Sequence, residues 1–130
     1  MNSNLFSGEA LAIHSAIMDY YHAGHALYAP ELYDKILHPE WKFFLLEDGK
    51  LKIVDRDEFN AWYAPENRDP ALEWETEVYS IDITAEIATV KLRIENQRVR
   101  YIDYLNLMKI DGIWWIVHKL SHEIRDVSSA

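Results

Sequence analysis

The sequence contains no cysteine, and that absence excludes several kinds of site together. A chain without thiols cannot form a disulfide, use a cysteine nucleophile or bind a metal through thiolates. It also has no run of about 18 apolar residues, the minimum for a helix that spans a membrane. Its first residues lack the basic start and small-residue cleavage site of a secretory signal. We therefore expect a cytoplasmic protein that does not bind membranes.

Positive charge is scarce. The chain has 13 Lys and Arg residues against 22 Asp and Glu, which gives a formal net charge of −9 at pH 7. Proteins that bind nucleic acids draw much of their affinity from cationic contacts with phosphates, so this charge argues against a nucleic-acid partner. Anionic membrane surfaces are disfavoured for the same reason.

Glycine is also scarce. The four glycines stand singly, and none belongs to a phosphate-binding or dinucleotide-binding loop. Neither the Gly-x-Ser-x-Gly nucleophile motif nor the His-Glu-x-x-His zinc motif occurs. The sequence therefore predicts no bound cofactor and no nucleotide-dependent chemistry.

What the sequence does contain is a large share of apolar and aromatic residues. Of its 130 residues, 49% are hydrophobic and 13% are aromatic, which suffices for one packed core and for the wall of a pocket. The polar loop at residues 65–70 is too short to join two domains. We expect a single domain over residues 1–130.

Three helices are expected in the first half of the chain. Apolar residues recur at helical spacing from position 8 to about Gly24, where the glycine would end the helix. Pro30 suits the first position of a short second helix, "PELYDKIL". Asp55 and Glu58 form a start like a capping box for a third helix over residues 56–64.

Strands dominate the rest of the chain. Asp48-Gly49 marks a hairpin, and four longer runs, at residues 72–84, 86–97, 99–110 and 113–124, have strand-like patterns. Helices followed by a meander of strands predict an α+β fold, with helices on one face of a mostly antiparallel sheet. Both alternating sets of residues in the last run are apolar, so we expect its outer face to meet a second copy of the chain in a homodimer.

The order of these elements, with the segments "YYHAGH", "HPEWKF" and "YIDYLNLMKIDGIWWIVHKLSH", resembles the nuclear-transport-factor-2-like superfamily. Within it, the chain is most similar to the group named "putative lumazine-binding", near the SnoaL-like polyketide cyclases. The resemblance implies a cone-shaped fold, in which a strongly bent sheet wraps around three N-terminal helices and leaves a cavity at its open end. Its members include isomerases, cyclases, dehydratases and protein-transport factors, so it implies no single activity.

The hairpin around Asp111-Gly112 carries polar residues between apolar ones. If the turn has two residues, Leu105 lies opposite His118, and Asp103 lies opposite Leu120. Asp103 and His118 are then diagonal neighbours on the concave face, about 7 Å apart at Cβ. A carboxylate beside an imidazole is a usual acid–base arrangement, which makes both residues candidate catalytic groups. Alternatively, both are buried polar residues that backbone groups or tyrosine hydroxyls satisfy.

The first predicted helix ends in two tyrosines beneath the expected cavity. We expect Tyr20 to donate a hydrogen bond to an oxyanion or a carbonyl, and Tyr21 to contact the ligand. Alternatively, both rings belong to the core, with their hydroxyls at its surface. The other expected ligand contacts are apolar or aromatic and line the same cavity: Trp41, Phe59, Trp62, Tyr101, Leu105 and Trp114.

The spacing of the histidines does not predict a metal site. His118 and His122 lie four positions apart on a strand, which separates them by roughly 13 Å, too far to share one ion. His22 and His25 are three positions apart at a helix end, without an evident acidic partner.

These observations lead to three hypotheses. In the first, the protein binds a small, largely apolar or aromatic molecule, with Asp103, His118 and a tyrosine as polar contacts. In the second, it is an isomerase, cyclase or dehydratase that uses Asp103 as a general base. In the third, it is a protein-interaction domain that acts through its outer sheet face, and its cavity is filled.

Overall fold

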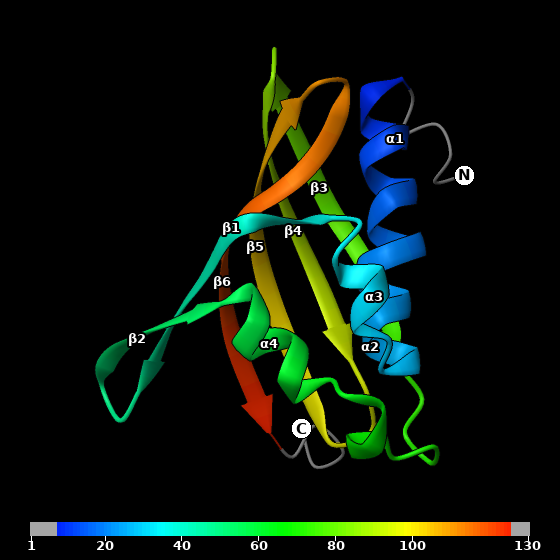
Figure 1. The fold of residues 1–130 in the computed structure, drawn as a ribbon, viewed down its shortest axis with the longest axis vertical. Coiled ribbons are helices and arrows are strands. Elements are labelled where there is room, and N and C mark those ends of the chain that lie inside the picture. The colour runs from blue at the N-terminus through cyan, green and yellow to red at the C-terminus, as the bar shows by residue number, and fades with distance from the viewer. Residues whose placement is uncertain (1–7, 126–130) are drawn as a thin grey trace.

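The computed structural model describes residues 8–125, and it places helices on one face of a curved sheet (Figure 1). One long helical segment comes first and has three parts: α1 (Glu9–Ala16), the π-helical η2 (Ile17–His22) and α2 (Ala23–Leu27). Shorter elements follow: α3 (Pro30–Tyr33), α4 (Arg56–Trp62) and the 3-10 turn η3 (Pro65–Asn67).

The sheet has six strands in the order β2-β1-β6-β5-β4-β3. Their bounds are β1 (Leu37–Glu47), β2 (Lys50–Asp55), β3 (Glu75–Thr84), β4 (Ile87–Glu95), β5 (Val99–Ile110) and β6 (Ile113–Arg125). All neighbouring strands are antiparallel except β1 and β6, which run parallel. In Figure 1 the β1–β2 hairpin extends to the left, away from α1, α2 and α3 on the right. The predicted α+β class with a mostly antiparallel sheet is confirmed.

Short polar signals set the ends of several elements as predicted. The Asp55 carboxylate accepts a hydrogen bond from the backbone N–H of Glu58, 2.9 Å away, and so caps α4. Asp111 and Gly112 both have positive φ, 51° and 81°, and this turn pairs Ile110 with Ile113.

The predicted end of the first helix is wrong. The helical segment passes through Gly24 and ends at Leu27, where Tyr28 adopts a left-handed conformation. Gly24 is instead a point of close packing, because a Cβ atom at this position would lie 2.4 Å from the Tyr33 ring. Glycine is therefore required here for helix packing rather than for a helix stop.

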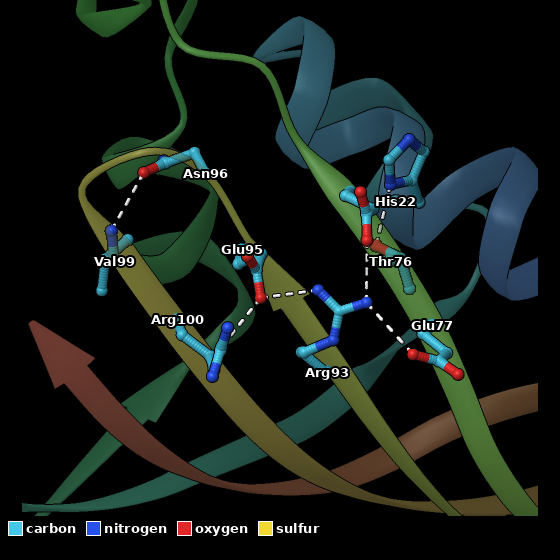
Figure 2. A network of polar contacts seen from close by, with 9 residues as sticks. His22, Thr76, Glu77, Arg93, Glu95, Asn96, Val99 and Arg100 are labelled. Carbon is cyan, nitrogen blue, oxygen red and sulfur yellow. Dashed lines mark hydrogen bonds and ion pairs between the residues drawn. The ribbon is translucent and has the colours of Figure 1, made fainter. Parts of the chain in front are cut away.

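The two faces of the sheet differ in chemistry. The inner face packs on the helices through alternating apolar residues such as Val90, Leu92 and Ile94. On the outer face of β3, β4 and β5, the Arg93 guanidinium contacts three glutamates, one of which also binds Arg100 (Figure 2). This part of the outer face is occupied by a network of ion pairs.

Candidate functional site

A cavity of about 510 Å³ opens at one end of the sheet, between α2, α4, and the ends of β1, β5 and β6. Small-molecule sites typically measure about 300–1,000 Å³, so this space can hold a ligand of one or two rings. Five aromatic residues line it: Phe43, Phe59, Trp62, Tyr63 and Tyr101. The remaining lining residues are His25, Leu45, Leu46, Glu47, Lys119, Ser121, His122 and Glu123.

The cavity has a buried inner end and an acidic mouth. His25 and Lys119 are buried, together with Phe43, Phe59 and Tyr63. Glu47 and Glu123 are exposed at the mouth. A ligand that enters therefore passes two carboxylates before it meets a wall of rings and a single buried cation.

Lys119 and Asp103 form a buried ion pair at the inner end. The Lys119 Nζ lies 3.9 Å from Asp103 Oδ2, and the side chains are 5% and 0% exposed. Tyr21 donates its hydroxyl proton to the same carboxylate oxygen over 2.6 Å. Burial raises the pKa of Tyr21 well above its ordinary value, and the Asp103 charge adds to this effect, so Tyr21 remains a donor.

Three aromatic rings surround the Lys119 ammonium. Its Nζ lies 4.4 Å from the centre of the Phe43 ring, 4.5 Å from that of Phe59 and 5.4 Å from that of Tyr21. Burial lowers the pKa of Lys119, and the Asp103 carboxylate opposes this effect. Within residues 8–125, Nζ has no hydrogen-bond acceptor, since 3.9 Å is too long for one.

His25 offers an acceptor to the same cavity. Its Nδ1 lies 2.9 Å from the backbone oxygen of Tyr21, and because a carbonyl can only accept, Nδ1 carries a proton. Burial, and then the charge of Lys119, lower the pKa of His25 well below its ordinary value. The ring is therefore neutral at pH 7, and Nε2 keeps a lone pair.

The comparison with known families identifies the chain. The family model described as "Putative lumazine-binding" matches residues 9–122, almost the whole chain. The chain belongs to this family. No curated protein shows significant sequence similarity to it.

Solved structures agree with this family assignment at the level of the fold. A protein of unknown function from Shewanella baltica, described as NTF2-like, superposes with a TM-score of 0.82 at 21% identity, over 91% of this chain and 95% of its own. An NTF2-like protein of unknown function from Silicibacter pomeroyi gives a TM-score of 0.79 at 18% identity, over 95% of this chain and 99% of its own. The predicted resemblance to the nuclear-transport-factor-2-like superfamily is confirmed.

The predicted register of the last hairpin is right only near the turn. Leu107 pairs with Ile116 as expected, but Asn106 pairs with His118, because Val117 is an extra residue in β6. Beyond this bulge, Asp103 lies opposite Ser121 rather than Leu120, and Leu105 opposite Lys119. In this member of the "Putative lumazine-binding" family, the bulge therefore turns Lys119 toward the cavity.

His118 is displaced to the outer face by the same bulge. Its Nδ1 lies 3.2 Å from the amide nitrogen of Asn106, and its ring packs against Phe44. The expected pairing of His118 with Asp103 is wrong, since the two side chains point to opposite faces of the sheet.

The structure brings some of the other predicted site residues together and separates the rest. Phe59, Trp62 and Tyr101 line the cavity, and Tyr21 lies beneath it. Four others do not line it: Tyr20, Trp41, Leu105 and Trp114. Trp41 and Leu105 are fully buried core residues, and Tyr20 is half-buried against the core. The Trp114 indole N–H donates to Glu9 Oε2 in α1, so Trp114 lies near the start of the helix.

Sequence reasoning missed the polar residues His25, Lys119 and Ser121 of the cavity wall, and also Glu47 and Glu123 at its mouth. His25 stood out in the sequence only as one of two closely spaced histidines. The alternation of Lys119, Ser121 and Glu123 is a polar set at strand spacing, but only knowledge of the Val117 bulge assigns that set to the inner face.

Neither a metal cluster nor a membrane-spanning helix is found in the part of the chain that the structure describes. No three His, Asp or Glu side chains within residues 8–125 lie close enough to hold one metal ion. None of the helices described there has the length and apolar character needed to cross a bilayer.

Proposed function

We propose that this protein binds a small, uncharged and largely aromatic molecule in the cavity. The main support is the combination of volume and lining, about 510 Å³ bounded by five aromatic side chains. The description of the family supports a flat heterocycle, and lumazine is the first compound to test. The formal net charge of −9 favours uncharged ligands over anions.

The polar contacts proposed for this ligand differ from those first expected. Lys119 can donate to a ligand carbonyl, and His25 can accept from a ligand N–H through Nε2. Ser121 also lines the cavity, and no residue among 8–125 satisfies its buried hydroxyl. Buried polar groups without partners are suited to fix the orientation of a ligand within apolar walls.

The enzymatic hypothesis with Asp103 as a general base has weaker support. The Asp103 carboxylate is fully buried, does not line the cavity and lies behind Lys119 and Tyr21. A general base must come within hydrogen-bond reach of the proton that it removes. Asp103 would therefore have to act through Lys119 or Tyr21.

A matched pair of tryptophan variants tests the binding site. Trp62→Ala removes one wall of the cavity, whereas Trp115→Ala removes a half-buried ring from the outer face of β6. The ligand is first found by a thermal-shift screen of lumazine and other pteridines, flavins, steroids and polyketide-like aromatics. We expect Trp62→Ala to weaken its binding at least about tenfold and Trp115→Ala to leave it unchanged. Equal losses in the two variants would place the ligand elsewhere.

We also propose that the outer face of β1, β2, β5 and β6 binds a second copy of the chain. The register places Phe44 beside both Ile53 and Leu120, and Leu120 beside Tyr104, so apolar side chains cross four strands. Leu51 extends this apolar surface and is 62% exposed. Monomers rarely expose contiguous apolar surfaces of this kind. A dimer with two-fold symmetry would cover this surface on both copies.

Sedimentation velocity tests this interface. We expect the protein to sediment as a dimer at micromolar concentration and Leu120→Glu to sediment as a monomer, because the substitution would bury one carboxylate from each copy in the interface. Ser80→Glu, on the exposed edge strand β3, serves as the control and should remain dimeric. A wild-type monomer at these concentrations would contradict the proposal.

A further inference from the structure

The most unusual group in the molecule is the primary amine of Lys119. It lies in the cavity wall, its side chain is 5% exposed, and three aromatic rings surround it. Its ion pair with Asp103 is longer than a hydrogen bond, so the amine is oriented by packing rather than by acceptors. A lysine needed only for solubility would lie in water, where most lysines are found.

Asp103 can act as the proton store for this amine. Its Oδ2 faces Lys119, and its Oδ1 is buried without a partner among residues 8–125. Transfer of one proton from Nζ to the carboxylate converts the ion pair into an amine and a carboxylic acid, which removes both formal charges from the apolar interior. Burial of Lys119 favours the same direction, because desolvation disfavours the ammonium. The neutral amine is the nucleophilic form of lysine.

We propose that Lys119 forms a Schiff base with the aldehyde or ketone group of an apolar ligand in this cavity. The inference rests on the proposed function, since it concerns the same cavity and the same class of uncharged molecules. It adds the reactive group that the ligand must carry.

The reaction balances with the groups that are present. Nζ moves from 3.9 Å to within hydrogen-bond distance of Asp103 Oδ2 and passes it a proton. The lone pair of Nζ then attacks the carbonyl carbon to form a C–N bond. A proton moves from the nitrogen to the former carbonyl oxygen and gives a carbinolamine. Asp103 returns its proton to the nitrogen, the group that it faces, and the nitrogen passes it to this hydroxyl, which leaves as water while the C=N bond forms. The product is a protonated imine beside the Asp103 carboxylate, and no oxidant or reductant is consumed.

Ser121 is placed to assist this addition. It lies two residues after Lys119 on the same strand face, and its buried hydroxyl has no partner among the described residues. A hydroxyl there can donate to the carbonyl oxygen as negative charge develops on it.

Reductive trapping tests the proposal. The full chain is incubated near pH 7 with 2-naphthaldehyde and sodium cyanoborohydride, which reduces an imine to a stable amine. Peptide mass mapping then compares Lys119 with the exposed Lys35 and Lys50. We expect Lys119 to be modified at least about tenfold faster, because the cavity holds the aldehyde beside Nζ and because burial lowers the pKa of Lys119 and so raises its neutral fraction at pH 7. Modification of Lys35 and Lys50 at an equal or higher rate would overturn the proposal.

The variant Lys119→Arg provides the matched control. It keeps a positive charge opposite Asp103, so the fold can be checked by circular dichroism, but a guanidinium does not form an imine under these conditions. We expect the intact mass to show the loss of the fast adduct, with the slow modification of Lys50 unchanged. A fast adduct that persists in this variant would assign the reactivity to another amine.

A ligand without a carbonyl separates this proposal from the proposed function. 2-Naphthalenemethanol has the same ring system and cannot form an imine, so its binding by isothermal titration reports the cavity alone. If the alcohol binds but Lys119 is not preferentially trapped, the Schiff base is rejected and the binding function stands. If the alcohol does not bind and Lys119 is not trapped, both proposals are rejected.

Discussion

The Lys119 ammonium and the Asp103 carboxylate lie 3.9 Å apart in the interior, and within residues 8–125 each is the nearest opposite charge of the other. Two strands contribute them, β5 and β6, at positions that a two-residue hairpin without a bulge would place on opposite faces. The pair therefore exists because Val117 is an extra residue, and the charge of the cavity depends on one irregularity in the sheet.

Removal of one partner of this pair should destabilise the protein strongly. We expect Lys119→Met and Asp103→Asn each to lower the free energy of unfolding by about 3–5 kcal/mol, because each leaves a buried polar group uncompensated. The double variant should be closer to the wild type than either single variant, since it buries no charge. Urea unfolding of the wild type, the two single variants and the double variant at pH 7 measures the coupling energy between the two side chains.

An exposed pair provides the comparison. Lys109 and Glu9 are 2.8 Å apart, closer than Lys119 and Asp103, but both side chains are partly in water. The corresponding single and double variants of Lys109 and Glu9 should show a much smaller coupling energy between the two side chains, because solvent screens the charges. Additive effects at Lys119 and Asp103 would contradict a buried ion pair.

Two buried tyrosines should respond differently to the loss of their hydroxyl groups. Tyr21 donates to the Asp103 carboxylate, whereas the Tyr33 hydroxyl is buried without a partner among residues 8–125. We expect Tyr21→Phe to lower the free energy of unfolding by about 1.5–3 kcal/mol, the usual contribution of a hydrogen bond to a charged group. Tyr33→Phe should be neutral or stabilising, because it removes an unsatisfied polar group. Chemical denaturation compares the two, and a similar loss in both would contradict the assignment.

Most of the fold could be predicted because its signals are local. Asp55 caps α4 through a residue three positions away, and the Asp111-Gly112 turn fixes the pairing of the residues next to it. Such signals act within a few residues, so they can be recognised in the sequence without knowledge of the tertiary structure.

The site was predicted less well because it depends on register and on packing between distant elements. The residues of β6 are apolar on both faces before Val117, so the pattern does not show that the strand shifts there. A shift of one residue moves every following side chain to the opposite face of the sheet. The cavity therefore contains Lys119 where the predicted register placed His118. Asp103 was correctly placed on the inner face because β5 has no bulge between it and Leu107.

Gly24 shows how a local signal can have a tertiary cause, and it leads to a further prediction. In an isolated helix, Gly24→Ala would stabilise by about 1 kcal/mol. Here the added methyl group would meet the buried ring of Tyr33 at 2.4 Å, and we expect a net loss of about 1–3 kcal/mol. Thermal unfolding measures this loss. The second substitution Tyr33→Leu should recover part of it, and a single variant that is more stable than the wild type would contradict the close contact.

The neutral state of His25 predicts how stability depends on pH. His25 is packed among the rings of Tyr21, Tyr33 and Tyr63 and faces the positive charge of Lys119. Its pKa in the folded protein lies well below the ordinary value of about 6.5, first because of burial and then because of Lys119. Between these two pKa values the unfolded chain binds a proton that the folded protein does not. The free energy of unfolding should therefore fall as the pH falls below 6.5, by up to about 1.4 kcal/mol per pH unit.

The variant His25→Asn isolates this effect. Its amide can still donate to the backbone oxygen of Tyr21, but it does not titrate, while the carboxylates of the two proteins titrate alike and cancel in the difference. We expect the stability advantage of the wild type over His25→Asn to shrink between pH 7.5 and pH 5.5 in urea unfolding. An advantage that stays constant would mean that the folded protein also protonates His25. In that case Nε2 could not accept a hydrogen bond from a ligand, and the cavity would present two cations instead of one.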